Sequence, residues 1–155
     1  MRISAKGEYA AKAVLYLSLK YPGVVTIHEV ARRHSIPIKY LEQILLSLKK
    51  AGLLESRRGV RGGYTLARAP EKISVGEVLR VVDGSFSQAS CVEVDLENPY
   101  VCPESDSCGL KQVWQDVQGA VERILFETSF DDVRKRTLTG MTRQGSRGAF
   151  LAYEI

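Results

Sequence analysis

Two short helical patterns separated by a tight turn constrain the fold of this chain more than any other feature of its sequence. The run Thr26-Ile-His-Glu29 has the spacing of a helix capping box, and it predicts a short helix that ends near His34. A second helix is predicted over residues 37–50, because its apolar residues recur at helical spacing and Gly52 stands just beyond its end. The apolar face of this second helix consists of Ile38, Leu41, Ile44, Leu45 and Leu48. Two helices joined in this way form a candidate helix-turn-helix.

A glycine-rich hairpin is predicted directly after the second helix. Residues 53–58 and 64–67 alternate like strands, and Gly59-Val-Arg-Gly-Gly63 connects them. The hairpin carries Arg57, Arg58 and Arg61. Glycines let a backbone approach phosphates, and arginines can contact the DNA backbone or enter the minor groove. The pattern therefore indicates the wing of a winged-helix domain. A nucleotide-binding loop is disfavoured, because the stretch has no Walker lysine and no strand–loop–helix context.

Helical patterns occupy most of the remaining sequence. Ser4 and Ser74 are good N-caps for helices over residues 5–20 and 75–82. A heptad pattern then runs through Leu110, Trp114, Val117, Val121, Ile124 and Thr128. We expect this long helix to pair with its twin across a two-fold axis, because DNA readers of this kind usually bind two half-sites. The alternative is a single helix that faces the core of its own chain. Ser129 begins a short helix over residues 130–137.

The predicted fold class is mainly α with a small β-hairpin wing, that is, a winged helix-turn-helix domain plus a long dimerisation helix. We expect four segments along the chain. These are the winged helix-turn-helix DNA-binding domain (residues 1–70), a connecting helix with a cysteine loop (71–107), the dimerisation helix with a short following helix (108–137) and a flexible tail (138–155).

The charge of the chain is divided between its halves. Residues 1–70 carry 13 Lys and Arg against 4 Asp and Glu, a net charge of +9, whereas residues 71–155 have a net charge of −5. A basic first half joined to an acidic second half implies two different tasks. We expect the basic half to bind a polyanion, namely double-stranded DNA through its phosphates.

All three cysteines of the chain, Cys91, Cys102 and Cys108, lie in one short acidic stretch without a sustained apolar period. An odd number of thiols cannot pair completely within one chain. The gaps of ten and five residues lack the C-x2-C pairs of structural zinc sites. Three thiolates with a fourth ligand from elsewhere favour an iron–sulfur cluster, either 2Fe–2S or 4Fe–4S. Redox-active thiols without metal, a zinc ion, and cysteines that only pack are the alternatives.

Several classes of protein are disfavoured by the sequence. No run of eighteen or more apolar residues is present, so we expect no membrane span. Glu8 and Lys12 interrupt the apolar N-terminal stretch, which therefore does not resemble a secretory signal, and a cytoplasmic location with reduced thiols is expected. We expect no enzyme, because there is no Ser/His/Asp set. The two histidines, His28 and His34, fall in the basic half as a surface residue and a helix-end residue.

Four blocks of the sequence together resemble the IscR/NsrR/RirA family of bacterial transcription regulators. They are MRISAKGEYA, PIKYLEQILLSLKKAGLLESRRGVRGGYTLAR, ISVGEVLRVVDG and the three cysteines ahead of a Trp-containing helix. The resemblance covers roughly residues 1–137. It implies a homodimeric winged-helix DNA-binding protein with an iron–sulfur cluster beside the dimerisation helix. Cluster state then changes DNA affinity in response to iron, redox stress or nitric oxide.

The chain departs from this family pattern around the cluster. Its first cysteine gap is longer, and Lys111 stands where the cluster-assembly regulator has a histidine ligand. Glu8 instead resembles the carboxylate that nitric-oxide sensors supply from the other subunit. The resemblance thus implies ligation by the three cysteines and by Glu8 of the partner, with His34 as the alternative fourth ligand.

The resemblance also assigns residues to DNA. Lys39, Tyr40 and Glu42 of the second helix-turn-helix element and Arg58 of the wing match family positions that face the duplex. Lys39 and Tyr40 suit phosphate, whereas Glu42 could accept a hydrogen bond from a cytosine amino group. The pattern of the hairpin adds Arg61 to this set.

Two other functions remain open from the sequence. One is an electron carrier, which would have no need of a helix-turn-helix or a wing. The other is a metal-free, thiol-based regulator that acts through a protein partner.

Overall fold

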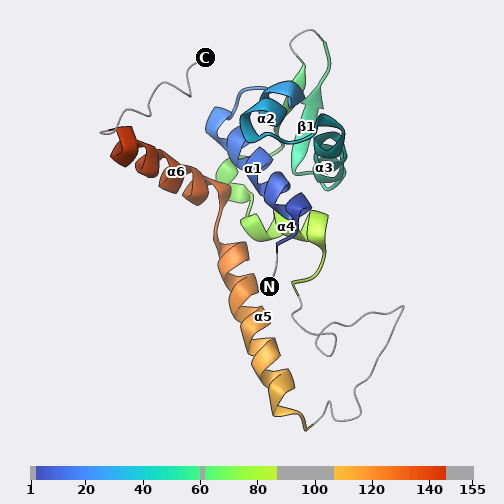
Figure 1. Cartoon of the computed structure of the whole chain (residues 1–155), viewed down its shortest axis with the longest axis vertical. Coiled ribbons are helices and arrows are strands. Elements are labelled where there is room, and N and C mark those ends of the chain that lie inside the picture. The colour runs from blue at the N-terminus through green and yellow to red at the C-terminus, as the bar shows by residue number, and fades with distance from the viewer. Residues whose placement is uncertain (1–2, 60–61, 87–106, 146–155) are drawn as a thin grey trace.

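The computed structural model describes residues 3–59, 62–86 and 107–145 (Figure 1). Its elements are α1 (Ala5–Lys20), α2 (Ile27–His34), α3 (Ile38–Lys50), β1 (Leu54–Arg57), β2 (Gly63–Leu66), a 3-10 turn η1 (Pro70–Lys72), α4 (Val75–Asp83), α5 (Gly109–Glu127) and α6 (Phe130–Gly145). The predicted fold class is confirmed, since a two-stranded antiparallel hairpin accompanies the helices of the described residues.

The body of the molecule is a winged-helix unit built on α1 to α4. Its helices begin where the sequence predicts, because the hydroxyls of Ser4 and Thr26 accept hydrogen bonds from the N–H groups of Gly7 and Glu29. Buried side chains from α1, α2, α3, α4 and the hairpin form one core. Fully buried members are Ala10, Ala13, Val14, Leu41, Ile44, Leu45, Leu48, Ile73 and Val78.

Polar contacts fix the start of α4. The Ser74 hydroxyl accepts from the N–H of Glu77, and the Glu77 carboxylate accepts from the N–H of Ser74 at 2.8 Å, which makes a complete capping box. Arg68 also donates to Glu77 at 3.0 Å. Burial alone would raise the pKa of Glu77, but the hydrogen bonds from Ser74 and Arg68 together hold that pKa below its usual value.

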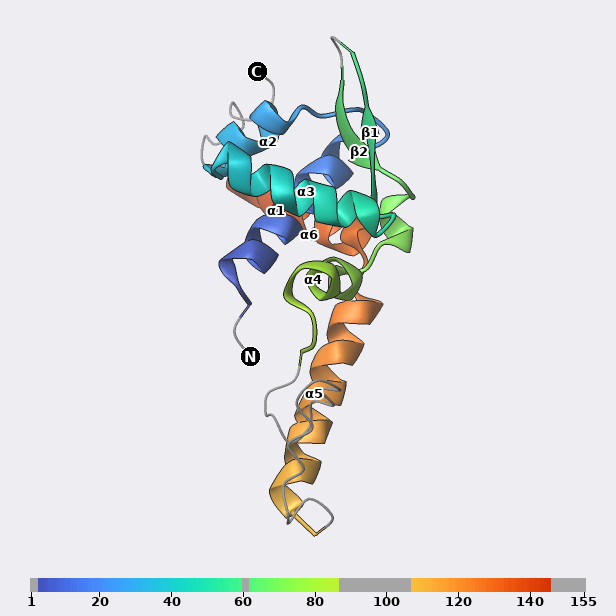
Figure 2. The ribbon, with the colours of Figure 1, turned by 90° about the vertical axis from the view of Figure 1, so that its right-hand side faces the viewer.

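Helix α5 leaves this body and extends away from it in both views (Figures 1 and 2). Among its residues, all of which are described, none is buried. The predicted heptad stripe is largely open to solvent, with Leu110 65 %, Trp114 39 % and Ile124 62 % exposed. A helix of this length whose apolar stripe is left open by the described residues is not a core helix.

Helix α6 differs from the prediction in length. It continues to Gly145, well past the predicted end at Thr137, so residues 138–145 are helical and not part of a tail. The Thr139 hydroxyl donates to the carbonyl of Lys135 at 2.9 Å, and Thr142 donates to Thr139 at 2.8 Å. These bonds satisfy polar side chains within the helix, which composition alone does not reveal. Residues 146–155 of the predicted tail lie outside the described residues.

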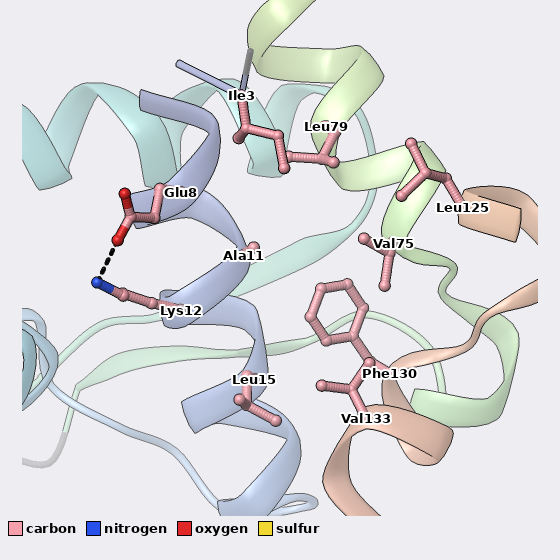
Figure 3. Close-up of a pocket in the computed structure, with 10 residues that line it drawn as sticks. All are labelled: Ile3, Glu8, Ala11, Lys12, Leu15, Val75, Leu79, Leu125, Phe130 and Val133. Atoms are coloured by element: carbon pink, nitrogen blue, oxygen red, sulfur yellow. Dashed lines mark hydrogen bonds and ion pairs between the residues drawn. The ribbon is translucent and has the colours of Figure 1, made fainter. Parts of the chain in front are cut away.

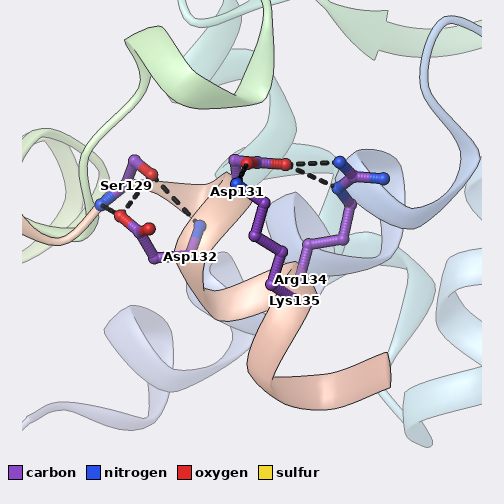
Figure 4. Close-up of polar contacts among 5 residues, drawn as sticks. All are labelled: Ser129, Asp131, Asp132, Arg134 and Lys135. Atoms are coloured by element: carbon purple, nitrogen blue, oxygen red, sulfur yellow. Dashed lines mark hydrogen bonds and ion pairs between the residues drawn. The ribbon is translucent and has the colours of Figure 1, made fainter. Parts of the chain in front are cut away.

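A second capping box begins α6 (Figure 4). The hydroxyl and N–H of Ser129 donate to the carboxylate of Asp132 at 2.6 and 3.0 Å, and the N–H of Asp132 donates to Ser129. Asp131 is buried and pairs with Arg134 and with Lys135, the latter at 2.6 Å. Hydrogen bonds from Lys135 and Arg134 lower the pKa of Asp131. The α5–α6 corner is also joined to α4, because Val75 donates to Thr128 at 2.9 Å.

The joint between α4 and α5 is tightly packed. A Cβ built on Gly76 would lie 2.8 Å from ring carbons of Phe126, so only glycine lets the two helices come this close. The guanidinium of Arg80 lies 4.4 Å from the centre of the Phe126 ring and 3.4 Å from the Glu122 carboxylate. Phe86, which follows α4, packs edge-on against Phe126.

Replacing Gly76 with valine should therefore separate α4 from α5. We expect Gly76→Val to lower the free energy of unfolding by about 1–3 kcal/mol, because the added methyl groups overpack the Phe126 ring. Urea denaturation followed by circular dichroism measures this loss. Gly119→Ala is the matched control, since nothing lies within 4 Å of a Cβ at that position of α5. A Gly76→Val protein as stable as wild type would contradict the tight joint.

Candidate functional site

Helix α3 presents one face to solvent beside the hairpin (Figure 2). Its opposite face is fixed in the core by Leu41, Ile44, Leu45 and Leu48, all fully buried. Lys39 and Glu42 are exposed on the outer side, as the helical period predicts. These two side chains are therefore accessible to a ligand that approaches α3.

Tyr40 has a different environment from these neighbours. It is half-buried, belongs to the partly buried shell of the core, and makes an edge-on contact with Tyr9 of α1 at 5.9 Å between ring centroids. The ring thus helps to hold α3 against α1.

Two apolar residues of α3 point away from the core. Leu46 is 49 % exposed, and Ile38, which the sequence placed on the inner face, is 39 % exposed. Leu46 follows the buried Leu45 and lies outside the apolar stripe of the helix. Its position in the helical period is the feature of the sequence that indicates an exposed side chain. Exposed methyl groups on such a helix can contact thymine methyl groups in a major groove.

The hairpin is anchored to the body at its base. Val25 and Tyr64 exchange backbone hydrogen bonds of 2.9 and 2.8 Å, and Lys49 of α3 donates to Ser56 of β1 at 2.6 Å. Gly59 has φ 109, a conformation that favours glycine. Arg57 and Arg58 are exposed at the end of β1, whereas Arg61 lies outside the described residues. The end of β1 thus carries two exposed arginines, and β1 packs beside α3.

Arg58→Ala should weaken DNA binding and flatten its salt dependence. Loss of one phosphate contact is expected to reduce the slope of log affinity against log salt by about 0.9. Fluorescence anisotropy at several salt concentrations measures both quantities. Arg123→Ala removes an exposed cation from α5, away from the hairpin, and serves as the control. An Arg58→Ala protein with the wild-type slope would remove Arg58 from the interface.

The two described members of the predicted cluster site lie far apart within one chain. Glu8 stands in the first turn of α1, is 58 % exposed, and accepts a hydrogen bond from Lys12 at 2.5 Å. Cys108 is the N-cap of α5, at the end of that helix remote from α1 (Figure 1). Cys91 and Cys102 lie outside the described residues. A single chain therefore does not bring Glu8 to Cys108.

Cys108 itself is available as a ligand. Its side chain makes no capping hydrogen bond to α5, and it is a free, half-buried cysteine. The first turn of a helix has unpaired N–H groups that favour negative charge, such as that of a thiolate-ligated cluster. Within the described residues no group of three or more His, Cys, Asp and Glu side chains is close enough to hold a metal ion.

His34, the alternative ligand, lies inside the winged-helix body. Its ring packs edge-on against Tyr16 at 5.7 Å, and its Nε2 is buried without a hydrogen-bond partner among the described residues. Burial lowers the pKa of His34, and the charges of Arg33 and Lys12 lower it further. The imidazole is therefore neutral at neutral pH, but it sits against α1 and not at the surface near α5.

An exposed α3, a basic hairpin beside it and a projecting helix together define a winged helix-turn-helix DNA-binding transcription regulator. The chain belongs to the Rrf2 family of iron-dependent transcriptional regulators, whose family model matches residues 3–136. No helix in the described part of the chain is long and apolar enough to cross a membrane.

Individual relatives agree with this assignment. An rrf2-like HTH-type transcriptional regulator of Rhodobacter capsulatus is 37 % identical over 120 residues, which cover 74 % of this chain and 80 % of the relative. The structure of CymR, the global cysteine regulator of B. subtilis, is similar with a TM-score of 0.72 and 28 % identity, over 88 % of this chain and 98 % of that one. T. potens IscR is similar with a TM-score of 0.69 and 31 % identity, over 88 % of each chain.

Proposed function

We propose that this protein is a homodimeric transcription regulator that senses redox, iron or nitric-oxide status through an iron–sulfur cluster. Cys91, Cys102 and Cys108 of one chain and Glu8 of the partner are the proposed ligands. The observation that carries this proposal is the position of Cys108 at the far end of α5, a helix whose apolar stripe is exposed. A ligand set that includes Glu8 can then be completed by a second copy.

The donor set suits iron. Thiolates are the preferred ligands of iron–sulfur clusters, and a carboxylate is a harder, weaker ligand for the same metal. When bound, the cluster supplies chemistry that reacts with oxidants or nitric oxide. Glu8 would supply the weakest of the four bonds to the cluster, and Lys12 competes for its carboxylate (Figure 3). The matching family is one of iron-dependent transcriptional regulators, which supports this choice of metal.

DNA contacts are proposed for both parts of the exposed face. Lys39 and Tyr40 would bind phosphate, Glu42 would accept from a cytosine amino group, and Arg58 and Arg61 would contact the backbone or minor groove. The exposure of Lys39, Glu42 and Arg58 supports their roles. The half-buried Tyr40 would offer only its ring edge or hydroxyl.

Anaerobic purification tests the sensor. We expect coloured protein with iron and acid-labile sulfide, whose operator affinity changes when the cluster is removed with a chelator. Anisotropy titrations of the two forms on one DNA fragment, selected from random sequence by the protein, provide the comparison. Coloured protein that does not retain DNA would point to an electron carrier and would refute the proposal.

A metal-free, thiol-based regulator acting through a protein partner is the second candidate. The similarity to a global cysteine regulator favours it. Colourless protein from anaerobic cells, with three titratable thiols per chain, would select this candidate.

A further inference from the structure

The outer face of α3, which lies beside the hairpin in Figure 2, is polar except at one residue. Leu46 is 49 % exposed, although it belongs to a helix whose other face buries four apolar residues. Its neighbours one turn away on the helix surface are all polar and exposed, namely Glu42, Gln43, Lys49 and Lys50. Leu46 is therefore an isolated apolar side chain and not the edge of an apolar patch on α3.

Leu46 lies near the middle of the face that points away from the core. At 3.6 residues per turn it is within about 20° of Lys39 around the helix axis. It is about 160° away from Ile44 and from Leu48, both of which are fully buried. Leu46 thus shares the side of α3 on which the proposed DNA-binding residues stand.

The charges around this face favour DNA over a protein as its partner. Three exposed lysines of α3 and two exposed arginines at the end of the adjoining strand β1 surround Leu46, namely Lys39, Lys49, Lys50, Arg57 and Arg58. Cations in this number favour a polyanion. A protein partner would need a larger apolar patch at the centre of its interface, which the polar neighbours of Leu46 do not provide.

The major groove of DNA offers a leucine side chain one kind of apolar partner. Base-pair edges in this groove present hydrogen-bond donors and acceptors together with the 5-methyl group of thymine. A leucine side chain neither donates nor accepts a hydrogen bond, so only the methyl group suits it. Leu46 follows Glu42 by four residues, about 6 Å along the helix axis, which corresponds to about two base-pair steps of DNA.

We propose that Leu46 reads the 5-methyl group of a thymine at one position of each half-site, within about two base pairs of the base at Glu42. The inference rests on the proposed placement of α3 against DNA and adds a base identity that hydrogen bonds from α3 do not supply. Ile38, the other exposed aliphatic residue of α3, lies about 80° away around the axis. It lines a hollow beside α2 with Arg32 and Ser35 and does not share this contact.

Replacing thymine with uracil tests the contact, because it removes the methyl group and keeps the base pair with its hydrogen bonds. The full-length protein is titrated by anisotropy on a fragment selected from random sequence, in which each thymine is replaced by uracil in turn. We expect one such replacement in a half-site to weaken binding by about fourfold, the equivalent of one buried methyl group. Leu46→Ala should bind the thymine duplex about fourfold more weakly and should lose nothing further with uracil at that position.

Two variants serve as controls for Leu46→Ala. Leu138→Ala makes the same change on α6, where the side chain is 44 % exposed, and should bind every duplex as the wild type does. Ile38→Ala should retain the uracil penalty at the position read by Leu46. Leu46→Ala preserves α3, because alanine has the highest helix propensity and the position is exposed. Thermal denaturation followed by circular dichroism checks that each variant is folded.

The uracil scan distinguishes a failure of this inference from a failure of the proposed DNA-binding face. A Leu46→Ala protein with the wild-type uracil profile, or a wild-type protein that no uracil weakens, overturns the inference. If Lys39→Ala and Glu42→Ala still weaken binding in that case, the proposed face stands without Leu46. If neither of them lowers the affinity, α3 does not read the bases and both proposals are refuted.

Discussion

Val117→Glu should convert the dimer into monomers and lower operator affinity by about 100-fold or more, because half-site binding loses the effective concentration that a second linked site provides. Val117 lies at the centre of the exposed stripe of α5 and is 40 % exposed in the single chain. The monomer therefore tolerates a carboxylate at this position. In a dimer that buries this stripe, the introduced carboxylates would lie in an apolar interface, where an unpaired charge is strongly destabilising.

Sedimentation velocity measures the change in mass, and anisotropy measures the operator affinity of the same samples. Gln115→Glu is the matched control, because it adds the same charge at an exposed position of α5 outside the stripe. It should remain dimeric and bind DNA normally. A dimeric Val117→Glu protein would show that the stripe is covered by something other than a second copy.

Cys102→Ala should abolish the visible chromophore, whereas Glu8→Ala should retain iron but shorten the lifetime of the cluster. Removing a thiolate takes away one of three strong ligands, so bound iron should fall nearly to zero. Removing the carboxylate leaves the thiolates in place and would open the fourth ligand position of the cluster to solvent. We expect the half-life of the chromophore in air to fall by about tenfold or more. Loss of a single supporting group around a metal site typically weakens metal binding by about 10- to 100-fold.

The measurement is anaerobic absorption spectroscopy with iron analysis, followed by timed exposure to air. Glu71→Ala removes an exposed acid from η1 and should change neither the spectrum nor the lifetime. A Glu8→Ala protein identical to wild type would remove Glu8 from the site. His34→Ala would then be the next variant, although its ring lies within the winged-helix body.

The beginnings and ends of the helices are the part of the fold that sequence reasoning predicts well. Ser4, Thr26 and Ser74 each accept a backbone hydrogen bond at the predicted helix start, and Gly52 and Gly84 adopt positive φ beyond predicted ends. These signals are local, so a single sequence contains them. The length of α6 was missed because threonine hydroxyls can bond either to their own helix or to water, and composition does not distinguish the two.

The candidate site is predictable only in part, because a single sequence contains only local signals. The helical period correctly exposes Lys39 and Glu42 and buries Leu41, but it also assigns Ile38 to the core. Ile38 is the first residue of α3, where the neighbouring turn and not the helix decides what lies beneath a side chain. The remoteness of Glu8 from Cys108 depends on the direction of α5, which no local pattern specifies.

The close contact of Gly76 with Phe126 couples the orientation of α5 to that of α4. Because α4 and α5 cannot slide at this joint without a clash, a displacement of the far end of α5 would be transmitted to the winged-helix body. A tilt of about 10° over a helix of about 28 Å displaces the far end by about 5 Å, comparable with the pitch of one helical turn. In a dimer that reads two half-sites, such a displacement would move α3 of one subunit out of register with the major groove of its half-site. If Cys108 ligates the sensor as proposed, tight packing at this one glycine would transmit a chemical change at Cys108 to the DNA-binding body.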